Sequence, residues 1–380
     1  MSDALAIDTE SNTWNTGAPF DGRHKSVCFS WATQGDAGAS PFEPGPVEKL
    51  RDAIAGTGVV IGFNLKYDLH VLRKRGITLP DGKRVWDCQL AEFILSNQQW
   101  KYPSLNESCE KYGLGSKIDL ISEKYWKNKI QTEDIPWIEL SEYARVDAEL
   151  SLLLYLHQVS AMTPSQMRLC RLMNADLLVL QEMEWNGLRF NEELCETRST
   201  EIKTKISEIT KELSSVYPNV PINFSSGDQL SAFLYGGTIV EEGKEHIGFF
   251  KTGIRAGQPK FQKIEIKHEL PRLVEPIRGS ALKKEGFFAT NADTLLKLKA
   301  NKATRRILSL IQQQVRLETL LSKTYNGLIK VRTEQNWERG ILHPQYNQVT
   351  VTTGRLSSSK PNGQNMDGAA NDLFISRFKD

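Results

Sequence analysis

A buried-strand pattern that runs directly into a helical pattern constrains the fold of this chain more than any other feature. Residues 58–62 read Gly-Val-Val-Ile-Gly, an apolar run bounded by glycine that predicts a strand inside a sheet. In the segment that follows, Leu65, Leu69 and Leu72 recur at helical spacing and predict a helix over 66–75. A strand followed by a helix is typical of α/β folds, so we expect a sheet flanked by helices.

The remaining predicted elements change in character along the chain. A strand is expected over 4–10 and a long helix over 138–157, and Pro164 marks a break. Beyond it, strands give way to predicted long helices at 165–185, 191–216 and 293–331. Residues 236–288 are Gly-rich with alternating polarity, which indicates an inserted β-hairpin, and 350–380 has the composition of a loop.

Composition indicates a soluble globular protein with more than one domain. The chain has 380 residues, of which 39% are hydrophobic and 25% charged. No apolar run approaches the ~20 residues that span a bilayer, and no signal peptide precedes the first strand, so we expect no membrane association and a cytoplasmic location. The five cysteines are scattered, with no Cys-x-x-Cys pair, which argues against a disulfide framework or a zinc site.

Charge is distributed unevenly along the chain. Residues 1–160 hold 17 Lys and Arg against 22 Asp and Glu, a net charge of −5, whereas residues 161–380 carry a net charge of +7. An acidic front part joined to a basic remainder is compatible with a metal-using site beside a surface that holds a polyanion. A solvated face is the alternative explanation.

Five residues of the front part form a candidate catalytic set. Asp8 and Glu10 are two apart on a predicted strand, so both carboxylates face the same side, as Mg²⁺ or Mn²⁺ ligands would. Asp68 follows the buried strand at the head of a helix, and Tyr143 and Asp147 are four apart on one helix face. Taken singly, Asp8 and Glu10 are better explained as surface acids on an edge strand. The alternatives for the others are a partner of the helix dipole for Asp68, a solvated acid for Asp147 and a half-buried core residue for Tyr143.

In combination these segments resemble a known family. The strand Asp-x-Glu, the segment Gly62-Phe-Asn-Leu-Lys-Tyr-Asp68 and the segment Tyr143-Ala-Arg-Val-Asp147 are similar in order and element type to the motifs of the DEDD superfamily of 3′-5′ exonucleases, in the subclass with tyrosine in its third motif. The second segment especially resembles that of bacterial DNA polymerase I and its phage relatives. The resemblance implies a ribonuclease H-like, mixed-sheet α/β domain.

The same resemblance implies roles for these residues. Asp8, Glu10 and Asp68 would hold a divalent ion that activates water, Asp8 would bridge to a second ion, and Asp147 would complete the first site. Tyr143 would orient the attacking water, since its ordinary pKa near 10 makes it a poor base at neutral pH. Trp14 would stack on terminal bases and Asn64 would lie next to the substrate strand, with core packing and turn formation as the alternatives.

The second half of the chain resembles the polymerase part of family A DNA polymerases. Segments 178–189 and 316–325 are similar to the turn that leads into the thumb and to the long thumb helix, and 352–365 is similar to the start of the palm. Gly363 and the pair Met366-Asp367 depart from the family pattern. The resemblance implies DNA contacts by Arg316, Lys323, Arg355, Ser357, Ser358, Asn362, Gln364 and Asn365.

The sequence therefore predicts an exonuclease domain over 1–160, a helical thumb over 161–335 with a β-rich insertion at about 236–288, and an incomplete palm over 336–380. The function expected is metal-dependent 3′-5′ DNA exonuclease activity, used in proofreading during DNA replication, with no polymerase activity by the chain alone. A second polypeptide with the palm and fingers would complete a split, phage-type polymerase, or the chain is a truncated form. The alternatives are a DNA-binding assembly subunit with weak or no exonuclease activity, and an exoribonuclease.

Overall fold

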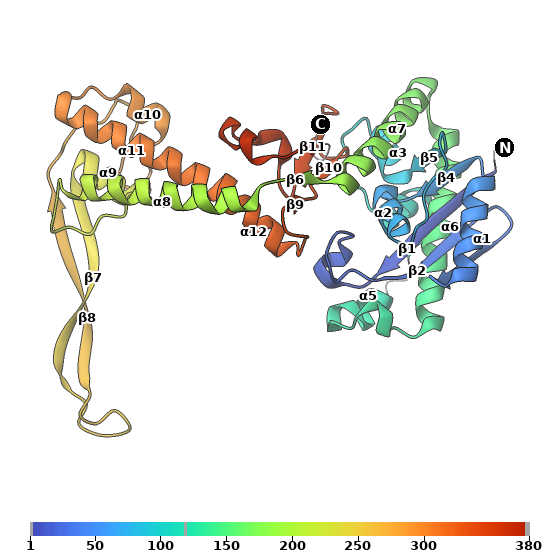
Figure 1. Cartoon of the computed structure of the whole chain (residues 1–380), viewed down its shortest axis with the longest axis horizontal. Helices are drawn as coiled ribbons and strands as arrows, with labels where there is room; N and C mark the ends of the chain where they lie inside the picture. The colour runs from blue at the N-terminus through green and yellow to red at the C-terminus, as the bar shows by residue number, and fades with distance from the viewer. Residues whose placement is uncertain (1–2, 118–119, 377–380) are drawn as a thin grey trace. The chain divides into compact units, whose positions relative to one another are not determined.

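The structure is a computed structural model that describes residues 3–117 and 120–376. Contacts divide the chain into two compact units. The first contains residues 1–192 and 328–380, and the second contains residues 193–327 (Figure 1). The outer limits expected for the first and last domains, residues 1 and 380, lie outside the described residues. Among the described helices, none combines the length and apolar character that a membrane crossing requires.

A five-stranded mixed sheet forms the centre of the first unit. Its strand order is β3-β2-β1-β4-β5, in which β1 pairs antiparallel with β2 and parallel with β4. The predicted strand-to-helix transition is confirmed: residues 59–62 form β4, buried throughout, and the chain continues into α2. The strands are β1 (Ala4–Ser11), β2 (Ser26–Ala32), β3 (Ala37–Pro41), β4 (Val59–Gly62) and β5 (Arg84–Asp87).

Helices cover the sheet and extend its core. The long helix α6 contacts β1, β2 and β3, and α7 contacts α2, α3 and β5. Leu177 of α7 belongs to the same hydrophobic cluster as Ile7 and Val60 of the sheet, which is why α7 lies in the first unit. The helices are α1 (Pro44–Gly56), α2 (Leu65–Lys74), α3 (Cys88–Leu95), α4 (Leu105–Tyr112), α5 (Leu120–Lys124), α6 (Trp137–Ala161) and α7 (Pro164–Asn186).

The C-terminal segment packs in the first unit and is more ordered than its loop-like composition suggests. Strand β6 (Leu188–Arg189) pairs with β9 (Ile341–Leu342), and β10 (Gln345–Asn347) pairs with β11 (Ser357–Ser359). Two short 3₁₀ helices follow, η5 (Gly363–Asn365) and η6 (Gly368–Leu373).

The second unit is helical with one long hairpin, as predicted. Its core joins Leu213 of α8, Phe233 of α9 and Ile311 of α11. Its elements are α8 (Glu192–Ser214), α9 (Gly227–Tyr235), β7 (Gly237–Phe249), β8 (Pro259–Leu270), α10 (Ala292–Lys297), α11 (Lys302–Leu320), the π-helical turn η4 (Leu321–Tyr325) and the start of α12 (Asn326–Glu334).

The single helix expected over 293–331 is wrong, because two interruptions divide it. The Asn301 side chain accepts a hydrogen bond from the Thr304 backbone N–H at 2.9 Å, which caps a new helix start at α11. Farther along, the π-helical turn at Leu321–Tyr325 brings the Ser322 carbonyl so close to Gly327 that a Cβ there would lie 2.7 Å from it. A hydrophobic period of 3.6 does not reveal either interruption.

Candidate active site

Strand β1 places Asp8 and Glu10 at the carboxyl end of the parallel part of the sheet. Its first residues, Ala4 to Ala6, pair with β4, and Ala4 to Ile7 are buried. Beyond this pairing, Asp8 and Glu10 lie opposite Ser30 and Cys28 of β2. Their two-residue spacing directs both side chains to one face of the sheet, and the carboxyl ends of parallel strands are where α/β folds form ligand sites.

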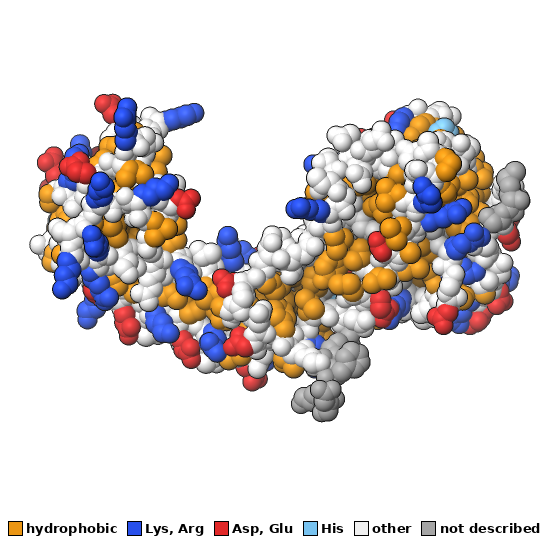
Figure 2. Space-filling model, turned by 90° about the horizontal axis from the view of Figure 1, so that it is seen from above, with side chains coloured by type: hydrophobic (Ala, Val, Ile, Leu, Met, Phe, Trp, Pro, Cys, Tyr) orange, Lys and Arg blue, Asp and Glu red, His pale blue; other side chains and the backbone are white. Residues whose placement is uncertain are grey.

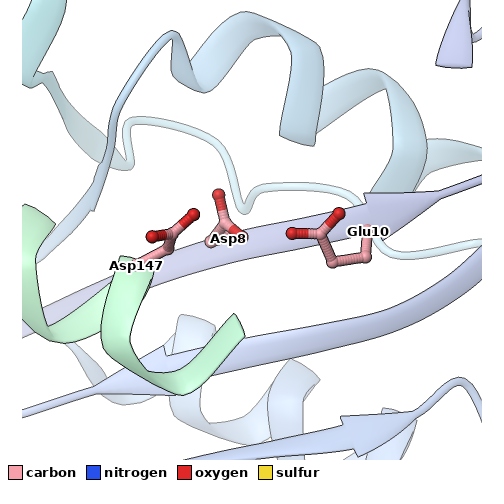
Figure 3. Close-up of side chains that lie close together, drawn as sticks. All are labelled: Asp8, Glu10 and Asp147. Atoms are coloured by element: carbon pink, nitrogen blue, oxygen red, sulfur yellow. The ribbon is translucent and has the colours of Figure 1, made fainter. Parts of the chain in front are cut away.

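Helix α6 brings Asp147 to the same place. Its buried face, which contacts the sheet, includes both Tyr143 and Asp147, four residues apart. One carboxylate oxygen each from Asp8, Glu10 and Asp147 lies within 4.8 Å of the others. Figure 3 shows the carboxyl groups of Asp8 and Glu10 on β1 beside that of Asp147 on α6. We refer to these three residues as the carboxylate cluster.

Asp68 lies next to the carboxylate cluster without joining its three converging oxygens. It is buried in the first turn of α2, where Thr9 Oγ1 donates a hydrogen bond to Asp68 Oδ1 at 2.7 Å. Thr9 stands between Asp8 and Glu10 on β1, so this bond holds Asp68 against the same end of the strand. Burial and the charge of Asp8 raise the pKa of Asp68 well above its ordinary value, although the Thr9 bond opposes this.

Burial and mutual repulsion make the carboxylate cluster electrostatically costly. Burial, followed by the charge of Asp147, raises the pKa of Asp8 to about 8. Burial, followed by the charges of Asp8 and Asp147, raises the pKa of Glu10 well above its ordinary range. In the described structure Asp8 Oδ2 is buried and makes no hydrogen bond. Converging oxygen donors with such an unsatisfied atom fit a hard divalent cation such as Mg²⁺ or Mn²⁺.

Lys117 and Tyr143 complete the immediate surroundings. Lys117 Nζ forms an ion pair with Asp147 Oδ2 and lies 5.2 Å from the centroid of the Tyr143 ring. The Tyr143 ring packs edge to face on Trp126, with centroids 5.6 Å apart. Burial and then the charges of Glu10, Asp147 and Asp8 raise the pKa of Tyr143 above its ordinary value, so its hydroxyl keeps its proton at neutral pH.

Sequence reasoning missed Lys117 and Thr9. Lys117 lies in the connection between α4 and α5, where no periodicity or motif marks it, so only the fold could bring it to Asp147. Thr9 did carry a signal, because it occupies the middle position of the Asp-x-Glu strand. Its contribution depends on Asp68, which is far away in the sequence.

Two further predicted residues lie at the sheet end of the first unit. Trp14 is 45% exposed, and the Arg23 guanidinium lies over its ring, 4.9 Å from the centroid, in a cation–π contact. Asn64 is exposed and holds a left-handed backbone conformation (φ 58°) before α2. The Asp87 carboxylate fixes this turn by accepting hydrogen bonds from the backbone N–H groups of Asn64 and Leu65, at 3.1 and 3.0 Å.

Asn64 also lines a cavity of about 280 Å³ between the α2 region and strand β10, together with Lys66 and Tyr346. A larger cavity of about 930 Å³ lies elsewhere, between the 77–86 segment and α7, and is lined by none of the four acidic residues described above. The four acidic residues therefore lie apart from the larger of these two cavities.

The predicted DNA-contact residues fall into two groups. In the second unit, Arg316 on α11 and Lys323 in η4 are exposed. In the first unit, the side chains of Arg355, Asn362, Gln364 and Asn365 are exposed. Ser357 and Ser358 are not freely available, since Ser357 Oγ donates to the Asn347 carbonyl at 3.5 Å and Ser358 Oγ accepts from Gly363 N–H at 3.2 Å. These serines therefore hold the local backbone.

Two family models match separate parts of the chain. Residues 1–159 match the model of the 3′-5′ exonuclease, and residues 273–375 match that of DNA polymerase family A. The first match contains the carboxylate cluster and Asp68. The second contains the residues from Arg316 to Asn365 named above.

Several polymerases are similar to the chain in sequence. "DNA polymerase DpoZ" of Salmonella phage PMBT28 is 28% identical over 176 residues, which make up 43% of this chain and 28% of that protein. DNA polymerase I of Synechocystis is 25% identical over 330 residues, 85% of this chain and 28% of the relative. DNA polymerase I of Bacillus subtilis is 26% identical over 308 residues, 80% of this chain and 29% of the relative. The chain thus spans under a third of these relatives' length.

A solved structure shares the fold. The polymerase domain of Pol1 from M. smegmatis, in complex with DNA primer-template and dNTP, matches with a TM-score of 0.66 at 19% identity, covering 96% of this chain and 52% of that one. The predicted α/β fold with a following helical region is confirmed. Together, the two family matches show that residues 1–159 carry a 3′-5′ exonuclease domain and that residues 273–375 carry a segment of DNA polymerase family A.

Proposed function

We propose that this chain removes nucleotides from the 3′ end of single-stranded DNA with the help of two divalent ions, Mg²⁺ or Mn²⁺. The observation that supports this most directly is the convergence of carboxylate oxygens from Asp8, Glu10 and Asp147 within 4.8 Å, beside the buried Asp68. Four carboxylates concentrate negative charge that two such ions would offset. As in the sequence-based expectation, Asp8, Glu10, Asp68 and Asp147 would hold them.

When bound, the ions would supply a water of lowered pKa and stabilise the charge that develops on the scissile phosphate. The protein groups would position the reactants. Tyr143 keeps its proton, so its hydroxyl can orient the attacking water without acting as a base. Thr9 fixes the orientation of Asp68 through its 2.7 Å hydrogen bond. A single-stranded end would be held by stacking on the exposed Trp14 ring and by polar contact with Asn64.

Digestion of a 5′-labelled single-stranded DNA oligomer tests this function. The wild-type chain with Mg²⁺ should give a ladder that shortens from the 3′ end, and EDTA or Asp8→Ala should abolish it. Asp52→Ala, which removes an exposed carboxylate on α1, is the matched control and should leave the ladder intact. If a folded, metal-loaded chain gives no ladder, the DNA-binding assembly subunit becomes the better explanation. Preferential digestion of a competing RNA oligomer would favour an exoribonuclease.

We also propose that a second polypeptide carries the polymerase palm and fingers. The proposed domain limits are 1–160, 161–335 and 336–380. Hydrophobic side chains gather on one face of the first unit in Figure 2. Helix α7, which belongs to this unit, also has exposed apolar side chains, including Leu172 and Val179, which are 60% and 59% exposed. Such a surface is suited to a protein interface. Addition of the palm-and-fingers polypeptide should slow amide exchange in α7 and residues 350–376, and unchanged exchange would contradict the proposal.

The duplex contacts proposed for Arg316, Lys323 and Arg355 are tested separately. Each is exposed, so substitution with Gln should weaken primer-template binding without unfolding the chain. Ser357 and Ser358 are proposed to hold the local backbone beside Arg355 rather than to contact DNA freely, because their hydroxyls already bond to backbone groups. Primer extension with dNTPs tests the further proposal that the chain alone does not polymerise.

A further inference from the structure

The hairpin formed by β7 and β8 carries a surface that the exonuclease chemistry does not use. The two strands pair from Gly237 and Leu270 out to Phe249 and Pro259. Figure 1 shows this ribbon projecting from the helices of the second unit. Its base is anchored, because Ile239 and Leu270 are buried in the core of that unit. The distal half makes no comparable contact and exposes both faces to solvent.

The tip of the hairpin is strongly basic. Residues 247–263 contain four cations, Lys251, Arg255, Lys260 and Lys263, and no acidic residue. Lys263 pairs with Glu242 at 3.1 Å. Within the described part of the chain, the other three are exposed and form no ion pair. A local net positive charge of this density attracts a polyanion.

Aromatic rings lie among these cations. His246 pairs with Phe261 across the strands, and a bulge at the next residue brings Phe249 to the same face. The His246 ring is 5.0 Å from the Phe249 ring and 5.5 Å from the Phe261 ring, centroid to centroid. Phe249 is 61% and Phe261 53% exposed. In the adjoining loop, the Arg255 guanidinium lies 5.9 Å from the Phe250 ring.

Among the described residues, no other helix or strand covers Phe249 and Phe261, so packing within the fold does not explain these exposed rings. Flat aromatic rings interleaved with cations that form no ion pair are typical of surfaces that bind single-stranded nucleic acid. On such surfaces the bases stack on the rings and the phosphates contact the cations. A duplex does not offer its base faces for such stacking. We therefore propose that the tip of the β7–β8 hairpin is a binding site for single-stranded DNA, with His246, Phe249 and Phe261 as the stacking surface and Lys251, Arg255 and Lys260 as the phosphate contacts.

Binding of a labelled oligothymidylate to the full chain in EDTA, followed by fluorescence anisotropy, tests this site. Each phosphate contact to a single strand contributes about 0.7 to the slope of log affinity against log salt. The variant K251Q/R255Q/K260Q should therefore lower the slope by about 2 and weaken binding about 100-fold at roughly 0.1 M salt. The variant F249A/F261A should weaken binding about tenfold or more with an unchanged slope.

A matched control variant distinguishes a local binding site at the hairpin tip from a general effect of net charge on DNA binding. The variant K203Q/K205Q/K211Q removes the same charge from the exposed side of α8 and should change binding much less. Equal losses in the two triple variants, or no loss in the hairpin variants, would overturn the proposal. Competition by blunt duplex or by oligouridylate as effective as that by unlabelled oligothymidylate would contradict the preference for single-stranded DNA. If the hairpin variants bind DNA normally but no longer bind a protein partner, the tip is a protein-binding site instead.

The proposed site at the hairpin tip is independent of the proposed exonuclease site, so experiments can refute either proposal without refuting the other. The hairpin variants should still digest the labelled oligomer when its concentration is saturating, because the carboxylate cluster is untouched. Conversely, Asp8→Ala should still bind oligothymidylate through the tip. Circular dichroism of each variant checks that the exposed substitutions leave the fold intact.

Discussion

Lys117 forms an ion pair with Asp147, the residue that α6 contributes to the carboxylate cluster. The lysine side chain is largely covered, with 24% of its surface exposed, and the aspartate side chain is buried. Burial alone lowers the pKa of Lys117, but the charge of Asp147 and the hydrogen bond to it raise the pKa above its ordinary value. Lys117 is therefore a permanent cation that partly neutralises the carboxylates of the metal-free chain.

Substitution Lys117→Gln should destabilise the metal-free chain and increase its response to metal. Loss of a charge-assisted hydrogen bond in this partly covered position should lower the free energy of unfolding in EDTA by about 2 kcal/mol. Because the ammonium competes for Asp147, Mn²⁺ should then stabilise the variant more than the wild type. Urea unfolding with EDTA and with Mn²⁺ measures both effects.

The matched control for this prediction is Lys124→Gln. Lys124 pairs with Glu139 at 2.8 Å on the surface of the same unit. An exposed pair contributes little to stability, so the control should change neither quantity appreciably. A response to Mn²⁺ that is the same in Lys117→Gln and in the wild type would rule out competition at Asp147.

The stability of the metal-free chain should fall as the pH rises toward 8. Burial and the charge of Asp147 raise the pKa of Asp8 to about 8, from an ordinary value of 3.8. The folded chain therefore retains a proton that the unfolded chain releases, and each rise in pH between these values favours the unfolded state. Urea unfolding in EDTA across this range should show the decline, and Asp8→Asn should flatten it.

Binding of Mn²⁺ should reverse the fall in stability with rising pH. The ligands must be ionised to bind a divalent cation, so the stabilisation by Mn²⁺ should grow as the pH rises. Parallel titrations with and without Mn²⁺ distinguish the two effects. A metal-free chain whose stability rises from about pH 5 to about pH 8 would contradict the burial of these carboxylates.

Substitution Tyr143→Phe should impair catalysis while preserving metal binding. The hydroxyl is the only group removed, and its proposed role is to orient the attacking water, so kcat should fall by about 10²-fold. The ring remains packed on Trp126, and the oxygens of the carboxylate cluster are unchanged. Single-turnover digestion measures the rate, and Mn²⁺-dependent stabilisation measures the ion site.

Tyr125→Phe is the matched control, since it removes a hydroxyl from a buried tyrosine whose partner is Glu139. The digestion rate of this variant should stay near that of the wild type. An equal fall in both variants would indicate a packing effect rather than a role for Tyr143 in the reaction.

Substitution Glu184→Gln should loosen the C-terminal segment. The buried Glu184 carboxylate accepts hydrogen bonds from Lys66 Nζ at 2.6 Å, from His70 Nε2 at 2.9 Å and from the Tyr346 backbone N–H at 2.6 Å. It thus joins α2, α7 and β10. Breaking a buried ionic network of this kind should cost about 3 kcal/mol, and the Tyr346 amide should exchange faster with solvent.

The pH response of this network follows from its ionisation. Burial alone raises the pKa of Glu184, but the His70 hydrogen bond and the Lys66 charge outweigh it and lower the pKa. Its contribution to stability is therefore present above the ordinary glutamate pKa and is lost as the pH falls through the lowered value. Glu182→Gln, at an exposed pair with Arg73, is the control and should leave Tyr346 exchange unchanged.

The amino-acid sequence determined the local elements and the residue types of the candidate site. A continuous apolar run bounded by glycine marked β4, helical spacing marked α2 and α6, and fixed spacings placed Asp8 beside Glu10 and Tyr143 one turn before Asp147. These relationships are short in sequence, so the geometry of a strand or helix is enough to predict them. The hairpin over 237–270 was likewise visible in its alternating pattern.

Only the tertiary structure decided which distant residues meet. The central position of β1 and the packing of α6 across it brought Asp147 to Asp8 and Glu10, and the same fold carried Lys117 to Asp147 and Asp68 to Thr9. The packing of α7 brought the Glu184 carboxylate within hydrogen-bond distance of the Tyr346 backbone N–H. The hydrogen bond from the Thr304 N–H to Asn301 begins a new helix inside the segment that periodicity predicted as one helix. Such contacts depend on long-range packing and on the desolvation of polar groups, which no local pattern of residues encodes.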